Sequence, residues 1–327
     1  TPREFNVKGG ALFLLGLVNL YVASGDAKYL EDMEYLYSRI LQKRIRTGSG
    51  SGFGYNFEWK ARAFSVPVET PNAVTTVFVA KALLEYHRRS QKDVAAILEE
   101  MKNFLLAEMI KFEDDKKLCF NYVPGKDAEI HNANLLVAAF LSEYYGLSGG
   151  KDGKLKEKIK KAVDFSVSDI NPDFSWPYGT KPFHRWVDNF HTAFNIESLL
   201  TISSIFPELA LDEIISNVIR YYLKELFRGD GTPKYYNDRL FPINIHVLAG
   251  TKILLNKLSG MEAKFGIDPE RVRQITNKNN EWIEKFRSPK GYFYCQKNRF
   301  FWNRIPYMRW AQAWMFYALS TDLLNAD

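Results

Sequence analysis

The sequence predicts an all-α protein folded as an (α/α)6 toroid, a six-hairpin barrel in which inner helices form a ring and outer helices surround it. Two observations predict this fold. Helices that are apolar nearly all round alternate with helices that keep a strongly polar face, as expected for buried and surface helices respectively. Similar segments also recur at a regular period: Asn72, Asn132, Asp188, His246 and Arg309 mark the starts of apolar helices, at separations of 60, 56, 58 and 63 residues.

The first apolar helix covers residues 8–24 and is ended by Gly25, a residue that commonly terminates helices. Later helices begin after aromatic, glycine-containing or proline-containing loops, such as the loop before Asn72. The predicted apolar, inner helices cover 8–24, 73–90, 133–150, 188–200, 245–260 and 310–324. The predicted polar-faced, outer helices cover 29–45, 93–112, 154–169, 211–227 and 269–286.

These helices predict one toroid domain over residues 1–327, with six inner and five outer helices. The first outer helix is therefore absent, and it would lie before Thr1. An open solenoid is the alternative, but its terminal repeats need polar outer faces. Because both terminal helices are strongly apolar, we expect a closed ring.

Composition limits the partners. The chain has 327 residues, 46% of them hydrophobic, and a formal net charge of +6. Its densest basic run, 151–161, mixes both signs of charge and is typical of the solvated start of an outer helix. We therefore expect no nucleic-acid surface, whereas the positive charge is compatible with an acidic substrate.

Cysteine usage and hydropathy address location. Cys119 and Cys295 lack metal-ligand spacing and have apolar or aromatic neighbours, so we expect two buried free thiols. We find no apolar run of membrane-spanning length and no signal-peptide pattern after Thr1. These features predict a cytoplasmic protein without a transmembrane segment, unless a targeting segment has been removed.

The segment 185–200, RWVDNFHTAFNIESLL, carries the clearest candidate chemistry. Asp188 stands at the N-cap position of a helix, and His191 shares its face because residues three apart are neighbours on a helix. The alternative is purely structural: Asp188 caps the helix and His191 is a satisfied core residue. We take Asp188, His191 and His246 as candidate catalytic residues, with Asp188 as a general acid.

In a toroid, all loops that enter inner helices meet at one end, where their polar and aromatic residues can line a cavity. Among these residues, Arg185, Lys234 and Arg309 are expected to make the cavity positive and to hold a carboxylate. Asn72 and Asn132 have a structural alternative as N-caps, and Arg309 could pair with an outer-helix acid. The predicted substrate-binding residues are Trp59, Asn72, His131, Asn132, Asn134, Trp176, Arg185, Trp186, Asp230, Lys234, Tyr235, Tyr307, Arg309 and Trp310.

Other chemistries lack their motifs. His131, His191 and His246 come from different repeats without an HExxH pair, so we expect no metal and no other cofactor. The GSGSGFG stretch lacks the GK[ST] ending of a phosphate loop and has no βαβ context. No nucleophile elbow or Ser-His-Asp spacing is present.

Five ordered motifs resemble a VpsJ-like polysaccharide-biosynthesis family: ETPNAVTTVFVAKALL, IHNANLLVAAFL, RWVDNFHTAFNIESL, DGTPKYYNDRLFPINIH and GYFYCQ…IPYMRWAQAWMFYALS. This resemblance implies a role in making surface glycans, with polysaccharide assembly proteins as possible partners. RWVDN and MRWAQAWMFYAL are also similar to segments of the unsaturated glucuronyl hydrolases, which are six-hairpin toroids. That likeness implies a catalytic role for Asp188, although Met308, Arg309 and Trp310 replace the Ser-Arg-Gly of those enzymes.

Three functions are compatible with these features. The first is a glycoside hydrolase or lyase-type enzyme acting on an acidic, uronate-like oligosaccharide or polysaccharide. The second is a toroid-type sugar epimerase in which His191 and His246 move a proton on opposite faces of the sugar. The third is a non-catalytic glycan-binding subunit of a polysaccharide assembly system.

Overall fold

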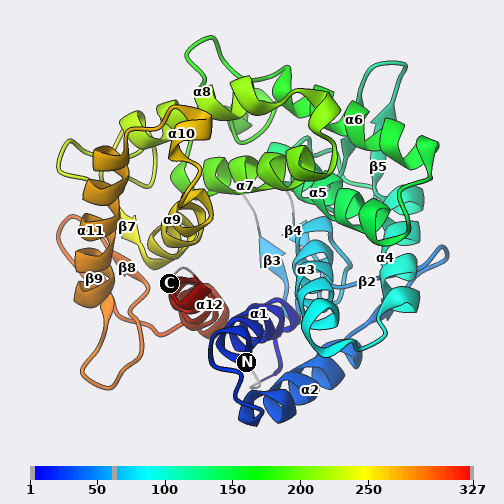
Figure 1. The fold of residues 1–327 in the computed structure, drawn as a ribbon, viewed down its shortest axis with the longest axis horizontal. Helices are drawn as coiled ribbons and strands as arrows, with labels where there is room; N and C mark the ends of the chain where they lie inside the picture. Colours follow the sequence, from blue (N-terminus) through cyan, green and yellow to red (C-terminus); the bar gives the residue numbers. More distant parts are fainter. Residues whose placement is uncertain (1–3, 61–64, 325–327) are drawn as a thin grey trace.

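The computed structural model describes residues 4–60 and 65–324 and shows the predicted helical toroid. The inner helical segments surround the centre of the molecule, and the outer helices lie around them (Figure 1). The inner segments begin within a few residues of the predicted positions. They are α1 (Val7–Ser24), α3 (Ala73–Ser90), α5 (His131–Leu147), α7 (Asn189–Ile205), α9 (Ile245–Leu258) and a π-helical segment η3 (Met308–Ala313) that continues into α12 (Trp314–Ser320).

The outer helices each follow an inner helix and bury one face against the ring. In the described part of the chain no outer helix precedes α1, so five complete hairpins are seen, as expected. Up to residue 324, where the described chain ends, α12 is followed only by the 3-10 segment η4 (Thr321–Leu324). The outer helices are α2 (Lys28–Leu41), α4 (Ala95–Glu108), α6 (Gly153–Val167), α8 (Asp212–Glu225) and α11 (Pro269–Phe286), the last preceded by the short α10 (Glu262–Phe265).

The ring is closed by direct packing of α1 on α12 (Figure 1). The rings of Phe13 and Phe316 lie 5.3 Å apart between their centres. The Asn19 amide donates a hydrogen bond to Ser320 Oγ at 3.0 Å. The predicted closed ring is confirmed, because in an open solenoid α1 and α12 would lie at opposite ends and would not pack together.

The loops contain short strands that helical periodicity could not predict. Each strand has two to four residues and pairs antiparallel with a strand from the same or a neighbouring loop, so its partner is fixed by the fold rather than by a local pattern. The pairs are β1 (Ile45–Arg46) with β2 (Ser51–Gly52), β3 (Trp59–Lys60) with β4 (Ser65–Val66), β5 (Ile110–Glu113) with β6 (Leu118–Phe120), and β8 (Gln296–Lys297) with both β7 (Ile243–Asn244) and β9 (Trp302–Asn303).

One backbone hydrogen bond recurs around the ring. The N–H at the start of an inner helix donates to a carbonyl in the loop of the following repeat, so each loop is fixed to the helix before it. These N–H groups have no partner within their own helix, and a loop carbonyl satisfies them. The bonds run from Ala73 to Tyr122, His131 to Tyr178, Asn189 to Tyr235 and Ile245 to Cys295, at 3.0 to 3.1 Å.

Helix α1 departs from one expectation. Its 18 residues have a mean hydropathy of 1.5, which is long and apolar enough for a membrane span by length and composition alone. Such a pattern is also typical of the core helix of a folded protein, and 56% of this helix is buried in the ring. The apolar character that matches a span is here used to pack against α2, α3 and α12.

Both cysteines are buried free thiols, as predicted. Burial raises the pKa of Cys295 to about 11, so its thiol stays protonated at neutral pH. Cys119 lies in β6 between Leu118 and Phe120, and burial likewise raises its pKa. Both side chains therefore act as small packing groups.

Ring closure predicts the effect of adding one methyl group at Gly16 in α1. A Cβ at this position would overlap the ring of Phe316 in α12. Gly16→Ala should therefore lower the free energy of unfolding by roughly 1–3 kcal/mol, the usual cost of overpacking. Gly146→Ala is the matched control, because no atom lies within 4 Å of its added Cβ, and it should be neutral or slightly stabilising. Equal urea midpoints for both variants would contradict the α1–α12 packing.

Candidate functional site

A cavity of about 290 Å³ lies where the inner helices begin and their preceding loops converge. Its volume is close to the lower end of the range that is usual for small-molecule pockets. It is lined by Lys8, Tyr55, Trp59, Val74, Tyr122, Asn132, Tyr178, His184, Trp186, Asp188, Phe190, His191, Phe194, Tyr235, Tyr236, His246, Arg309 and Trp310.

Asp188 and His191 form a hydrogen-bonded pair in this cavity. Asp188 is the N-cap of α7, and its Oδ1 accepts the backbone N–H of His191 at 2.9 Å. Its Oδ2 lies 2.6 Å from Nδ1 of His191 and accepts the indole N–H of Trp186 at 3.0 Å. Asp188 is only 2% exposed, so these three donors replace the water that a carboxylate would otherwise bind.

This geometry gives the two residues different capacities. A carboxylate that accepts from Nδ1 fixes the tautomer with the proton on that nitrogen, which leaves Nε2 with a lone pair. No hydrogen bond within the described residues occupies Nε2 of His191. His191 is therefore placed to exchange a proton with a ligand. Asp188, which we expected to act as a general acid, contacts His191 Nδ1 and Trp186 Nε1 through Oδ2, and its catalytic role stays a prediction.

Lys8 and Arg309 bring positive charge to the cavity. Lys8 is 6% exposed and has no ion pair with a described carboxylate; its Nζ lies 4.2 Å from the centre of the Phe78 ring. Burial, helped by the charge of Arg309, holds the pKa of Lys8 well below its usual value. The Arg309 guanidinium stacks 4.7 Å from the ring centre of Tyr55. Cations with aromatic neighbours and no acid partner remain available to a ligand oxygen.

His246, a predicted catalytic residue, lines the cavity in a different state from His191. It is 2% exposed, and both of its ring nitrogens are buried without a hydrogen-bond partner. Burial, with the charges of Lys8, His191 and Arg309, holds its pKa well below the usual value, so the ring is neutral. The rings of Phe190, Trp310 and Trp314 pack against it at 4.4 to 4.7 Å. This environment favours a neutral wall over a proton carrier.

Aromatic rings form most of the remaining wall. Tyr178 and Trp186 stack with their centres 4.6 Å apart and an angle of 13° between their planes. The ring of Tyr178 also lies 4.5 Å from that of His191. Among the predicted binding residues, Trp59, Asn132, Trp186, Tyr235, Arg309 and Trp310 line the cavity.

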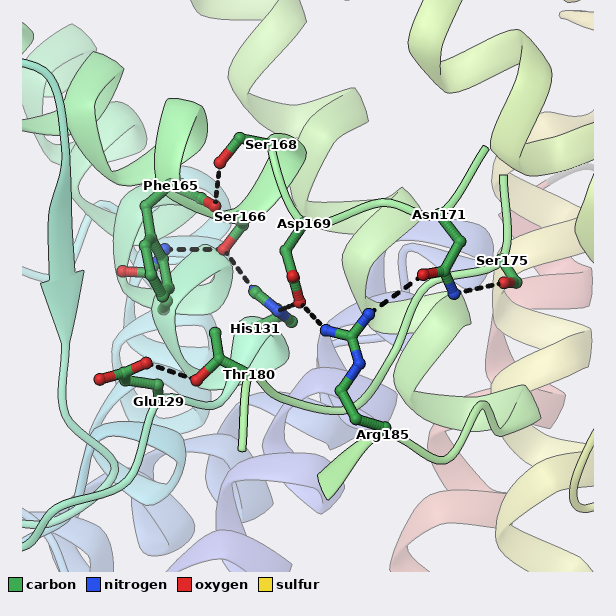
Figure 2. Close-up of polar contacts among 11 residues, drawn as sticks. Glu129, His131, Phe165, Ser166, Ser168, Asp169, Asn171, Ser175, Thr180 and Arg185 are labelled. Carbon is green, nitrogen blue, oxygen red and sulfur yellow. Dashed lines mark hydrogen bonds and ion pairs between the residues drawn. The ribbon is translucent and has the colours of Figure 1, made fainter. Parts of the chain in front are cut away.

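Three other predicted binding residues, His131, Asn134 and Arg185, belong to a structural network outside the cavity lining, and Figure 2 labels His131 and Arg185. His131 is fully buried, with Nδ1 3.2 Å from Ser166 Oγ and Nε2 2.8 Å from Asp169 Oδ2. Arg185 forms an ion pair with the same Asp169 instead of facing a ligand (Figure 2). Asn134 donates to the Ala162 carbonyl at 2.7 Å. These side chains connect the start of α5 and the loop that precedes α7 to the end of α6.

The other predicted residues outside the cavity mostly satisfy nearby backbone. Asn72 caps α3 by accepting from Thr75 N at 2.9 Å, the alternative considered from the sequence. Asp230 caps a turn at Thr232, Lys234 donates to the Asn237 carbonyl, Trp176 is buried beside His131, and Tyr307 is exposed. The predicted positive charge of the site therefore comes from Lys8 and Arg309 and not from Arg185 or Lys234.

Sequence reasoning missed Lys8 and Tyr122 as cavity residues. Lys8 occupies the start of the first inner helix, the position equivalent to the starts at Asn132, Asp188 and His246. That register was the available signal. Tyr122 provides the loop carbonyl that accepts from Ala73, and its ring packs 5.1 Å from that of Trp59, another cavity residue.

The burial of His246 predicts a pH-dependent stability. Its pKa is depressed on folding, so below pH 6.5 the unfolded chain binds a proton that the folded chain does not, and stability falls with pH down to the folded pKa. His246→Gln should remove this slope, by up to about 1.4 kcal/mol per pH unit. We would measure urea unfolding at pH 7 and pH 5 for both proteins. Parallel pH slopes would mean that His246 is protonated in the fold.

No protein-family model and no curated protein sequence matches the chain. Solved structures do match it. A sugar epimerase from a ruminal bacterium aligns with a TM-score of 0.74 and 13% identity, covering 98% of this chain and 88% of that one. A family 76 glycoside hydrolase from a bovine Bacteroides thetaiotaomicron strain aligns at 0.72 and 11%, covering 98% and 69%.

A third structure is a possible member of the GH105 family from Salmonella enterica serovar Paratyphi A. It aligns with a TM-score of 0.67 and 13% identity, covering 99% of this chain and 84% of the other. At such identities a likeness establishes architecture and not chemistry. The chain therefore has the (α/α)6 toroid fold, the six-hairpin architecture shared by these epimerase and glycosidase structures.

Proposed function

We propose that this protein is a carbohydrate-active enzyme that moves a proton on a carbon atom of a sugar, as an epimerase or isomerase does. His191 is the base, Asp188 orients it, and Lys8 and Arg309 stabilise the negative oxygen that forms. The Tyr178–Trp186 stack provides an aromatic face for the sugar ring.

The observation that carries this proposal is that the carboxylate in the cavity lining is already hydrogen-bonded to other side chains. Asp188 is the only Asp or Glu among the described residues that line the cavity, and its oxygens are engaged by His191 and Trp186. Glycoside hydrolysis ordinarily needs two carboxyl groups on either side of the scissile bond. A histidine held by a carboxylate, in a cavity also lined by Lys8 and Arg309, suits proton abstraction better.

The proposed step balances without a cofactor. Nε2 of His191 takes the proton from the carbon beside a sugar carbonyl, and the C–H electrons form a carbon–carbon double bond. The carbonyl oxygen becomes an enediolate oxygen, which the two cations stabilise. Protonation of the same carbon on its opposite face, by an acid on that face or after the bound sugar rotates, gives the epimer. Protonation of the former carbonyl carbon, with the hydroxyl proton of the first carbon moving to the former carbonyl oxygen, gives the isomer.

The structural comparisons support carbohydrate chemistry but are compatible with more than one reaction. One similar structure is described as a sugar epimerase and another as a family 76 glycoside hydrolase. Lyase chemistry on a uronate remains the second candidate, because Lys8 and Arg309 could neutralise a sugar carboxylate while His191 removes the adjacent proton. An unsaturated product would identify this reaction, whereas an epimerase leaves the sugar saturated and its length unchanged.

The Asp188–His191 pair gives the first test. Incubation with reducing sugars in deuterated water should replace the proton beside the carbonyl, as followed by NMR. In Asp188→Asn an NH2 donor replaces one of the two acceptor oxygens, so the side chain can no longer accept from all of its present donors on His191 and Trp186. The rate of proton exchange should therefore fall at least about a hundredfold. Asp152→Asn is the matched control, because Asp152 caps the outer helix α6 and Asn caps equally well.

The control separates a cap from a catalytic partner. Asp152→Asn should fold and exchange protons at the wild-type rate. If Asp188→Asn also keeps the wild-type rate, or loses it only in proportion to unfolded protein, Asp188 is a helix cap alone. If it loses exchange and keeps glycan affinity, a purely glycan-binding role for the protein is excluded.

Lys8 gives a second test because it is buried without an ion pair. Lys8→Met keeps the length of the side chain but removes the charge, so proton exchange should fall roughly 10²- to 10³-fold, while stability should hold or rise. Lys252→Met is the control: Lys252 is equally 6% exposed, but it lies 2.8 Å from Asp322 and is not among the residues that line the cavity. It should lose stability and keep activity. Reduced stability with full activity in Lys8→Met would make Lys8 structural.

A further inference from the structure

The β8–β9 hairpin and the segment after it carry an exposed, basic and apolar surface. We define this basic hairpin strip as residues 297–308, KNRFFWNRIPYM. Five of the 13 exposed large hydrophobic residues among the described residues fall within it: Phe300, Phe301, Ile305, Tyr307 and Met308. Phe300 is 84% exposed, which is unusual for a residue of this size.

The strip is held in place and is not a frayed end. β8 pairs with β7 on one side and with β9 on the other, and the ring of Trp302 packs 4.9 Å from that of Phe286 in α11. Asn298 N donates to the Phe301 carbonyl at 2.8 Å and closes the turn. Figure 1 shows β8 and β9 at the outer edge of the ring. The hairpin is therefore fixed in a position that leaves the side chains of Phe300 and Phe301 exposed to solvent.

Charge sets the same region apart. Residues 285–321 contain seven of the 44 Lys and Arg residues and none of the 38 Asp and Glu residues. The rest of the chain therefore has 37 cationic and 38 acidic residues, so this segment accounts for the whole net positive charge. Within the strip, Lys297, Arg299 and Arg304 form no ion pair with a described carboxylate, and each stacks on an aromatic ring instead.

We propose that the basic hairpin strip docks on the surface of an anionic lipid bilayer. Exposed apolar clusters on folded proteins mark interaction sites. An anionic bilayer offers both complements at once, because its headgroups attract Lys and Arg while its interface accepts Phe, Ile and Met side chains. Phe300 and Phe301 enter the interface, and the three cations contact lipid phosphates.

Other occupants fit the strip less well. A soluble polyanion would satisfy the cations but would leave Phe300, Phe301 and Met308 in water. A second copy of the chain would place two strips without acidic residues against each other across a two-fold contact, with like charges facing. The bilayer is the occupant that uses every exposed side chain of the strip.

Docking would also orient the cavity. Arg309 and Trp310, which line the cavity, directly follow Met308 at the end of the strip. The part of the cavity wall that η3 contributes therefore directly follows the proposed membrane contact in the chain. This inference concerns location and does not depend on the reaction carried out in the cavity.

The test is co-sedimentation of the full chain with vesicles of phosphatidylcholine alone or mixed with phosphatidylglycerol. The wild-type protein should bind the anionic vesicles at low salt, bind neutral vesicles weakly, and be released as salt screens the charges. Phe300→Ser/Phe301→Ser and Arg299→Gln/Arg304→Gln should each weaken binding by about tenfold or more.

Matched variants distinguish the strip from general charge and hydrophobicity. Lys151→Gln/Lys154→Gln removes the same two charges from an exposed, unpaired site at the start of α6, and Tyr35→Ser removes an exposed ring from α2; both should bind like wild type. All changed residues are exposed, so unchanged circular dichroism and melting temperature should accompany each variant.

Four outcomes would overturn the proposal. The first is that the wild-type protein does not bind anionic vesicles. The second is that the control variants weaken vesicle binding as much as the strip variants do. The third is loss of binding on removing the arginines but not the phenylalanines, which would indicate a polyanion site. The last is a dimer in solution that Phe300→Ser/Phe301→Ser converts to a monomer, which would assign the strip to self-association.

Discussion

The fold depends on how the first N–H of the inner helices α3, α5, α7 and α9 is satisfied. Helix starts carry N–H groups without intrahelical partners, and burying them unpaired would be costly. Here the partner is a carbonyl from the loop of the next repeat, as in the bond from Asn189 to Tyr235. Each repeat thus fixes the loop that follows it, and the loops converge on one end of the ring. The cavity is a consequence of that arrangement.

Asp188 combines this structural requirement with chemistry. One carboxylate oxygen caps α7 through the backbone of His191, and the other holds the side chain of the same residue. The backbone bond ties the position of His191 to the helix start, and the side-chain bond fixes its tautomer. Because the carboxylate is buried, each bond is stronger than it would be in water. The same carboxylate of Asp188 therefore both caps the helix and orients the imidazole of His191.

The cavity concentrates positive charge in an apolar setting. Lys8 and Arg309 face aromatic rings and no described carboxylate, and their charges help to keep His246 neutral. Such an arrangement lowers the stability of the empty protein, since a buried ammonium lacks its water. Buried, unpaired charge that costs stability is typical of functional sites, where a ligand supplies the missing partner.

The sequence by itself determined the helices, their inner or outer position and the caps at Asn72 and Asp188, because these follow from local periodicity and from side chains that bind their own backbone. Asn132, which the sequence also offered as a cap, lies inside α5, whose N-cap is Ile130. Asn72 and Asp188 have the same local signal, an acceptor side chain before an apolar helix. Only the tertiary structure decided that Asp188 faces the cavity beside His191 while Asn72 remains a cap, since that depends on which neighbouring loop packs above each helix.

The same reason explains the misplaced residues. His131 and Arg185 looked like ligands because polar groups at helix starts can face a cavity, but Asp169 at the end of α6 engages both. Lys8 was not singled out from the sequence, and ring closure by η3 and α12 places Arg309 and Trp314 near it. Contacts between residues some 300 positions apart leave no periodic trace in the sequence, so the ring had to close before the site could be recognised.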